Sequence, residues 1–140
     1  MTISKSIFVK RPVEATFRNF TADIGRWWPL KEGFSNGRER ADLILIEGRV
    51  GGRFFERYTD GEEFDVGRVT AFDPPERLAF TWRQANWSAE TSVEVRFAAE
   101  ADGTRVTLEH RGWEALGEPG RKVQESYGSC WEFILTRFAA

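Results

Sequence analysis

The feature that most constrains the fold is a series of about six short segments in which apolar and polar residues alternate. They span residues 41–47, 53–59, 62–72, 77–83, 91–99 and 104–111. A period of two places the apolar side chains on one face of a β-strand. Asp-Gly pairs at 60–61 and 102–103 are typical of tight hairpin turns. We therefore predict an antiparallel meander with one apolar face, which another element must cover.

The C-terminal segment, from about Pro119 to Phe138, is the one element long enough to cover that face. Its apolar residues recur at steps of three and four, the spacing of one face of a helix. They are Val123, Tyr127, Trp131, Ile134, Leu135 and Phe138. A curved sheet wrapped around one helix leaves space between the two unless large side chains fill it. This geometry raises the question of an internal cavity.

The N-terminal forty residues predict a strand and two short helices. Residues 2–9 alternate weakly, as in a strand. Pro12 suits the first turn of a helix, and the spacing of Val13, Phe17 and Phe20 predicts about ten helical residues. A second short helix around residues 24–28 ends at Pro29, and residues 30–40 are expected to form a loop. The predicted class is α+β, with one domain over residues 1–140.

Composition excludes several functional classes. The 140 residues include 20 Lys and Arg against 22 Asp and Glu, and this net charge of −2 argues against a nucleic-acid-binding domain. No apolar run approaches the roughly 20 residues that cross a bilayer, and the N-terminus does not resemble a signal peptide, so we expect a cytoplasmic protein. Aromatic residues make up 14% of the chain. Such rings fill ordinary cores, but they also line ligand cavities.

The residue types needed for metal, disulfide or cofactor chemistry are scarce. Cys130 is the single cysteine and His110 the single histidine, too few for an internal disulfide or a catalytic zinc site. Gly48, Gly51 and Gly52 lie between two predicted strands, so they do not form the glycine-rich loop that cradles phosphate before a helix. We expect no metal and no cofactor, and a quiet, buried Cys130.

Several local motifs carry a resemblance to a known family. The segments are GGRFFE at 51–56, GRVTAFDPP at 67–75, LAFTW at 78–82 and GTRVTLEHRGW at 103–113. Together with the order of elements, they resemble the START-like (SRPBCC) helix-grip superfamily. Within it, the chain is similar to bacterial homologues of the C-terminal domain of the activator of the 90-kDa heat-shock-protein ATPase. This resemblance implies a curved antiparallel sheet of six to seven strands around a long C-terminal helix. The superfamily includes lipid carriers, receptors, cyclases and co-chaperones, so the resemblance leaves the function open.

Twelve residues are candidates for the wall of a ligand cavity. They are Trp28, Phe54, Glu56, Arg68, Phe80, Trp82, Phe97, His110, Trp113, Tyr127, Trp131 and Leu135. His110 either anchors a ligand or acts as a base, or else it is bonded to the backbone or solvated. Glu56 is either a buried carboxylate paired with Arg68 or part of a surface ion pair. For each single Trp, core packing is the alternative to a place in the cavity wall.

Three hypotheses about function follow. The leading one is binding of an apolar or aromatic small molecule, lipid-like or polyketide-like, between the sheet and the C-terminal helix. The second is a chaperone-cofactor-like module that binds a protein through Trp87 and the loop at 30–40. The third is a cyclase or hydrolase that uses His110 as acid or base. An exposed edge strand also allows pairing into a homodimer.

Overall fold

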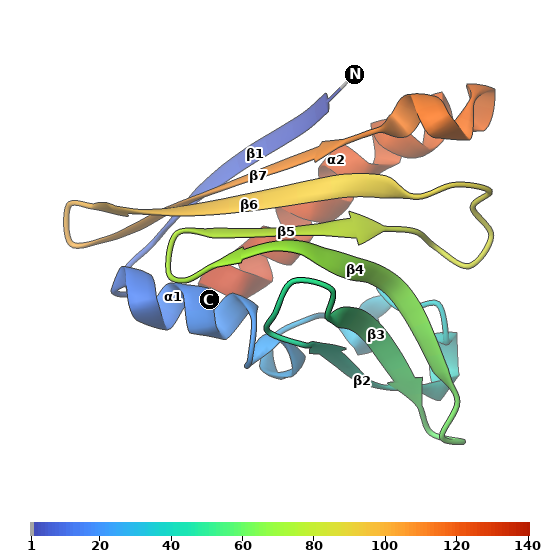
Figure 1. The fold of residues 1–140 in the computed structure, drawn as a ribbon, viewed down its shortest axis with the longest axis horizontal. Helices are drawn as coiled ribbons and strands as arrows, with labels where there is room; N and C mark the ends of the chain where they lie inside the picture. Colours follow the sequence, from blue (N-terminus) through green and yellow to red (C-terminus); the bar gives the residue numbers. More distant parts are fainter. Residues whose placement is uncertain (1) are drawn as a thin grey trace.

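Seven strands form one antiparallel sheet, and every strand except β1 pairs with its neighbour in sequence. The spatial order is β1-β7-β6-β5-β4-β3-β2. In this computed structural model, which describes residues 2–140, the strands are β1 Thr2–Val9, β2 Ala41–Ile46, β3 Arg53–Tyr58, β4 Glu63–Asp73, β5 Arg77–Trp82, β6 Thr91–Glu100 and β7 Gly103–Arg111. β1 returns to the far edge and pairs with β7, from Thr2 opposite Arg111 to Val9 opposite Thr104 (Figure 1).

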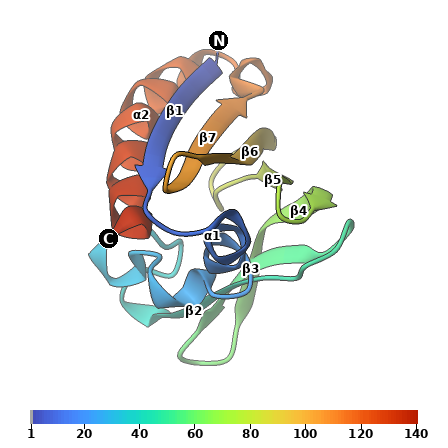
Figure 2. The same cartoon turned by 90° about the vertical axis from the view of Figure 1, so that its left-hand side faces the viewer.

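Helix α2, Glu118–Ala139, lies along the concave face of this sheet (Figure 2). Its buried residues include Tyr127, Trp131, Ile134, Leu135 and Phe138, the face that the three- and four-residue spacing predicted. An ion pair between Lys5 on β1 and Glu132 on α2, at 2.6 Å, joins the helix to the edge of the sheet. The predicted α+β class and helix-grip architecture are therefore confirmed.

Helix α1, Val13–Phe20, lies near the C-terminal end of α2 (Figure 1). Phe17 and Phe20 pack edge-on against Phe97 of β6, at centroid distances of 5.1 and 5.9 Å. Phe20 also contacts Phe138 of α2, at 5.2 Å. These aromatic contacts fill the space between sheet and helix at this end of the molecule.

The connection between α1 and β2 differs from the predicted short helix followed by a loop. It holds three single turns of 3-10 helix, η1 Ile24–Arg26, η2 Leu30–Glu32 and η3 Arg38–Arg40. The second predicted helix is thus only the turn η1, and residues 30–40 contain two further turns. A last turn, η4 Trp113–Leu116, connects β7 to α2.

Two irregularities bend the sheet where β3, β4 and β5 meet. The register shifts between Phe54 and Phe55 in the β3–β4 ladder, and between Val69 and Ala71 in the β4–β5 ladder. Gly67 lies between these two points, and a Cβ atom added to it would meet the carbonyl oxygen of Thr81 at 1.7 Å. Such bulges increase twist and bend a strand. The β2–β3 end of the sheet therefore curls away from the rest, as Figure 2 shows.

Candidate functional site

A cavity of about 410 Å³ lies where the curled part of the sheet, α2 and the segment after η1 come together. The segment contributes Trp28 and residues 33–36 and 38. The sheet contributes Glu56 of β3, Trp82 of β5 and residues 84–86 beyond it. Helix α2 contributes Tyr127, Cys130, Trp131 and Ile134.

Three tryptophans form the apolar wall of this cavity. The ring of Trp28 lies 6.0 Å from that of Trp82 and 6.2 Å from that of Trp131, and the last two are 6.0 Å apart. The indole N–H of Trp28 donates a 2.9 Å hydrogen bond to the carbonyl of Phe34. The rings are held by mutual packing and by this bond, so the wall is apolar and its side chains are fixed in place.

Tyr127 places a hydroxyl group beside this wall. Its oxygen accepts hydrogen bonds from two donors, the Nε1 of Trp82 at 3.0 Å and the Nε2 of Gln84. Burial raises the pKa of the phenol well above its usual value, because the charged form would lose its hydration. The group is therefore a neutral hydroxyl at any physiological pH.

Glu56 of β3 contributes a carboxylate to the lining, although the residue is only 2% exposed. It accepts hydrogen bonds from the hydroxyls of Ser35 at 3.1 Å and Tyr58 at 2.9 Å. The backbone N–H of Asn36 donates at 3.0 Å and the Asn36 amide at 3.3 Å. Every contact is a donor, which is how a buried carboxylate anion is satisfied. Burial and the bond to Glu56 raise the pKa of Tyr58.

Asn36 joins this carboxylate to the segment that follows β5. While its backbone and amide N–H groups donate to Glu56, its Oδ1 accepts a 3.0 Å hydrogen bond from the N–H of Ala85. Phe34, which also lines the cavity, stacks on Phe133 of α2 at 5.3 Å. Glu32 and Arg137 form a two-bonded ion pair at 2.5 Å beside that stack. Residues 32–36, named here the strap, are thereby fastened across the cavity.

His110 lies in the core behind the cavity wall and is fully buried. Its Nδ1 accepts a 3.0 Å hydrogen bond from the Nε1 of Trp131. Because Nδ1 accepts, Nε2 carries the proton and donates to the hydroxyl of Thr91 at 2.6 Å. Thr91 in turn donates to the carbonyl of Trp82 at 2.9 Å. Burial lowers the pKa of His110 to about 3, so the ring is neutral and fixed in one tautomer.

Comparison with known proteins decides the family. The family model described as Activator of Hsp90 ATPase homolog 1-like protein matches residues 10–140. The chain belongs to this family. Among curated proteins, none matches it significantly.

Solved structures share the fold of this AHSA1-like chain over 99% of its length. Protein MLL2253 from Mesorhizobium loti has a TM-score of 0.73 and 19% identity, with 94% of that chain covered. The Aha1 dimer from Colwellia psychrerythraea has a TM-score of 0.71 and 18% identity, with 93% covered. Txn09, an anthrahydroquino-gamma-pyrone synthase, has a TM-score of 0.65 and 29% identity, with 94% covered.

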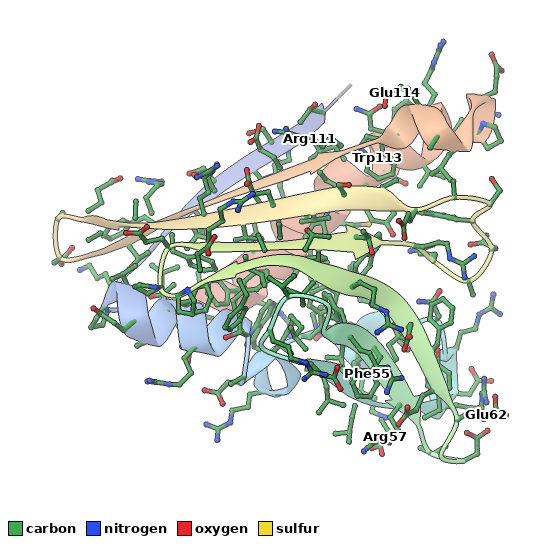
Figure 3. All side chains as sticks on the ribbon, in the orientation of Figure 1. Phe55, Arg57, Glu62, Arg111, Trp113 and Glu114 are labelled. Atoms are coloured by element: carbon green, nitrogen blue, oxygen red, sulfur yellow. The ribbon has the colours of Figure 1, made fainter. Side chains whose placement is uncertain are left out.

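In the structure of this AHSA1-like protein, five of the twelve residues proposed from its sequence line the cavity. These are Trp28, Glu56, Trp82, Tyr127 and Trp131. Phe54, Phe80, Phe97 and Leu135 are buried core residues that do not line it. Trp113 lies where β7 meets η4, on the far side of the molecule from Phe55 of β3 (Figure 3). It packs on Tyr127 and donates from Nε1 to the carbonyl of His110 at 3.0 Å, so it supports the wall from behind.

The predicted pairing of Arg68 with Glu56 is wrong. The ladder places Arg68 opposite Arg53, whereas Glu56 lies opposite Phe64. Arg68 points outward, where it contacts Asp65 at 3.4 Å and the carbonyl of Gly51 at 3.5 Å. Glu56 does not form a surface ion pair either. Because Arg68 faces Arg53, it lies three residues along the ladder from Glu56, and strand alternation alone does not fix which residues of two strands face each other.

Trp87 is also placed differently from the prediction. It was expected at the surface as a partner contact, but it is only 7% exposed. Its ring packs against Trp113 at 5.7 Å and Tyr127 at 5.4 Å. The loop after β5 folds back over the sheet, because Arg83 reaches the carbonyl of Trp87 at 3.2 Å. No outward tryptophan is therefore available there for a protein partner.

Ten residues of the cavity lining, most of its polar ones among them, were not proposed from the sequence. The missed residues are Gly33, Phe34, Ser35, Asn36, Arg38, Gln84, Ala85, Asn86, Cys130 and Ile134. Most lie in irregular segments, where no periodicity indicates which way a side chain points. Ile134 was assigned to the buried face of the helix but not to a site. Cys130 was expected to be buried, but it is only half-buried and lines the cavity beside Trp131; partial burial raises the pKa of its thiol.

The described part of the chain, residues 2–140, contains no group of three or more His, Cys, Asp or Glu side chains placed to hold a metal ion. Across the same residues, no helix is long and apolar enough to span a membrane.

Proposed function

We propose that this AHSA1-like protein binds an apolar, aromatic small molecule in the cavity between the sheet, α2 and the strap. The observation that carries the proposal is the cavity itself, about 410 Å³ with three indole rings on one wall. Ligand sites are typically of this size, mostly apolar, with a few polar groups that fix orientation. Here Tyr127, Gln84 and Glu56 are those groups.

Binding would be driven by removal of apolar surface from water, at roughly 25 cal/mol for each Å². Large flat rings favour ligands that stack or pack edge-on against them. Txn09, the 29% identical structure, supports an aromatic ligand, since it is an anthrahydroquino-gamma-pyrone synthase of the same fold. A polyketide-like ligand therefore suits this cavity better than a lipid-like one.

Binding, rather than catalysis through His110, is favoured by the geometry of the core. His110 does not line the cavity, and Trp131 and Thr91 occupy its two ring nitrogens. It serves instead to hold Trp131, one of the cavity walls.

Family membership favours a second candidate, a protein-interaction module that acts on a chaperone. Its surface would be the exposed part of residues 31–40, since Trp87 is buried. A pull-down from lysate would test it, with the double variant Lys31→Ala, Glu39→Ala as the control that should lose the partner. The expected cytoplasmic location, and a homodimer formed through the free edges of β1 and β2, remain predictions.

The leading proposal is tested by native mass spectrometry of freshly purified protein, followed by denaturation and analysis of released molecules. We expect a bound aromatic compound of defined mass. Cys130→Trp should fill the cavity and abolish the adduct. Ser129→Trp adds the same side chain at an exposed position of the same helix and should retain it. Wild-type protein that carries no ligand and takes up no compound from an aromatic library would contradict the proposal.

A further inference from the structure

The hydroxyl proton of Tyr127 is not used in the hydrogen bonds that this residue forms within residues 2–140. A phenol oxygen accepts up to two hydrogen bonds and donates one. Trp82 and Gln84 supply both accepted bonds. An indole nitrogen can only donate, so Trp82 cannot take the Tyr127 proton. The hydrogen bonds of residues 2–140 give that proton no acceptor, and the hydroxyl borders the cavity.

The two donors also fix where this proton points. Trp82 is held by Trp28 and Trp131, and the Tyr127 ring is held between Trp87 and Trp113 at 5.4 and 5.2 Å. With both lone pairs engaged, the remaining direction around the oxygen belongs to its hydrogen. A donor held in this way binds an acceptor oxygen without loss of side-chain freedom.

The carboxylate of Glu56 limits the charge of a ligand that could accept a hydrogen bond from Tyr127. Its carboxylate lies in the cavity wall and has four donors from Ser35, Asn36 and Tyr58 around it. A second carboxylate in the same enclosed space would be repelled by this charge. Arg38, the one arginine of the lining, is exposed. The interior is therefore suited to a neutral acceptor such as a ketone, and not to the headgroup of a fatty acid.

We infer that the Tyr127 hydroxyl is the recognition donor of the cavity, and that it selects flat aromatic ligands with a neutral carbonyl oxygen. The inference rests on the proposed function and names the ligand chemistry of the same site. Trp82 and Gln84 act as positioning residues for this donor. The tryptophan wall holds the ring system, and Tyr127 distinguishes a ketone from the corresponding hydrocarbon.

The test uses a matched pair of probes, 9-fluorenone and fluorene, which differ in the carbonyl oxygen. Binding is followed by quenching of tryptophan fluorescence in wild type and in Tyr127→Phe. We expect wild type to bind the ketone about three- to ten-fold more tightly, the effect of one net hydrogen bond. Tyr127→Phe should lose this preference, so that its affinities for fluorenone and fluorene become equal, and binding of fluorene also shows that the variant is folded.

Infrared difference spectra provide a second measurement that needs no variant. The carbonyl stretch of bound fluorenone should shift to lower frequency than in an apolar solvent, as expected for a hydrogen-bonded ketone. Equal affinities for both probes, with an unshifted carbonyl, would overturn this inference and leave the binding function standing. Failure of fluorenone to bind at all would also overturn it. The proposed function falls with it only if native mass spectrometry finds no bound molecule.

Discussion

At the scale of single residues, His110 makes a prediction about pH. Its pKa is about 3 in the folded protein, whereas an unfolded histidine titrates near 6.5. Between these values the unfolded chain binds a proton that the folded chain does not, so stability is lost as pH falls through this range. We expect the free energy of unfolding to drop by about 2 kcal/mol from pH 7 to pH 5 through this residue alone. Urea unfolding at several pH values measures it.

The variant His110→Gln separates this effect from the titration of carboxylates. Glutamine can still donate to Thr91 and accept from Trp131, but it does not titrate. We expect a loss of about 1–3 kcal/mol at pH 7, from imperfect hydrogen bonds in the core. Between pH 7 and pH 5 its stability curve should be nearly flat. An equally steep curve in wild type and variant would show that His110 is not the neutral, buried group described above.

The sequence predicted residue types of the site better than their contacts. Trp82, Tyr127 and Trp131 were proposed because apolar spacing places them on the inner faces, and Trp28 because it is a large aromatic side chain; all four line the cavity. Glu56 could be proposed by alternation, but its partners Ser35 and Asn36 come from a segment without periodicity. Hydrogen bonds between residues about twenty positions apart depend on the path of that segment, which local patterns do not contain.

At the scale of elements, the bend between β4 and β5 depends on Gly67. A Cβ atom there would meet the Thr81 carbonyl, so Gly67→Ala must displace a strand. We expect a loss of about 1–3 kcal/mol, as for other overpacked sites. Gly128→Ala is the control, since a Cβ atom there meets nothing closer than Lys5 at 3.9 Å. In the middle of α2 it should stabilise the protein by up to about 1 kcal/mol. Thermal unfolding of both variants tests the pair.

A second prediction at this scale concerns the contacts that hold the strap against α2. It is fastened to α2 by the Phe34–Phe133 stack and by the ion pair of Glu32 with Arg137. An exposed ion pair contributes about 0–1 kcal/mol, less than an aromatic stack with its buried area. Phe133→Ala should therefore accelerate hydrogen exchange in residues 32–36 more than Arg137→Ala does. Exchange in β6 and β7 serves as the internal control, and the reverse order of effects would contradict this account.

Elements were predictable where one period governs a long segment. The meander and α2 follow from alternation and helical spacing, and each strand begins and ends within about two residues of its predicted limits. Residues 30–40 were predicted only as a loop, because the turns η2 and η3 are stabilised by contacts with distant elements, such as Glu32 with Arg137 of α2 and Arg40 with Tyr58 of β3. The register shifts in the ladders of β2–β3, β3–β4 and β4–β5 were also invisible, because alternation within one strand does not show how it pairs with the next.

At the scale of the whole molecule, the cavity is formed by parts that are distant in sequence. Its walls come from the strap, β3, β5 and α2, so it exists only when the sheet has closed around the helix. A ligand bound there is bound to the folded state alone. By mass action it stabilises that state by about 2.7 kcal/mol when its free concentration is 100 times its dissociation constant. Binding and global unfolding should therefore be coupled.

This coupling can be measured with 9-fluorenone and thermal unfolding. The midpoint of wild type should rise by several degrees and keep rising with the logarithm of ligand concentration. Far-ultraviolet circular dichroism and tryptophan fluorescence should report the same midpoint, because sheet and helix lose the cavity together. Cys130→Trp, with the cavity filled, should show no ligand dependence, whereas Ser129→Trp should behave as wild type. If the ligand shifted the fluorescence midpoint but not the dichroism midpoint, its binding site would lie outside the cavity between the sheet and α2.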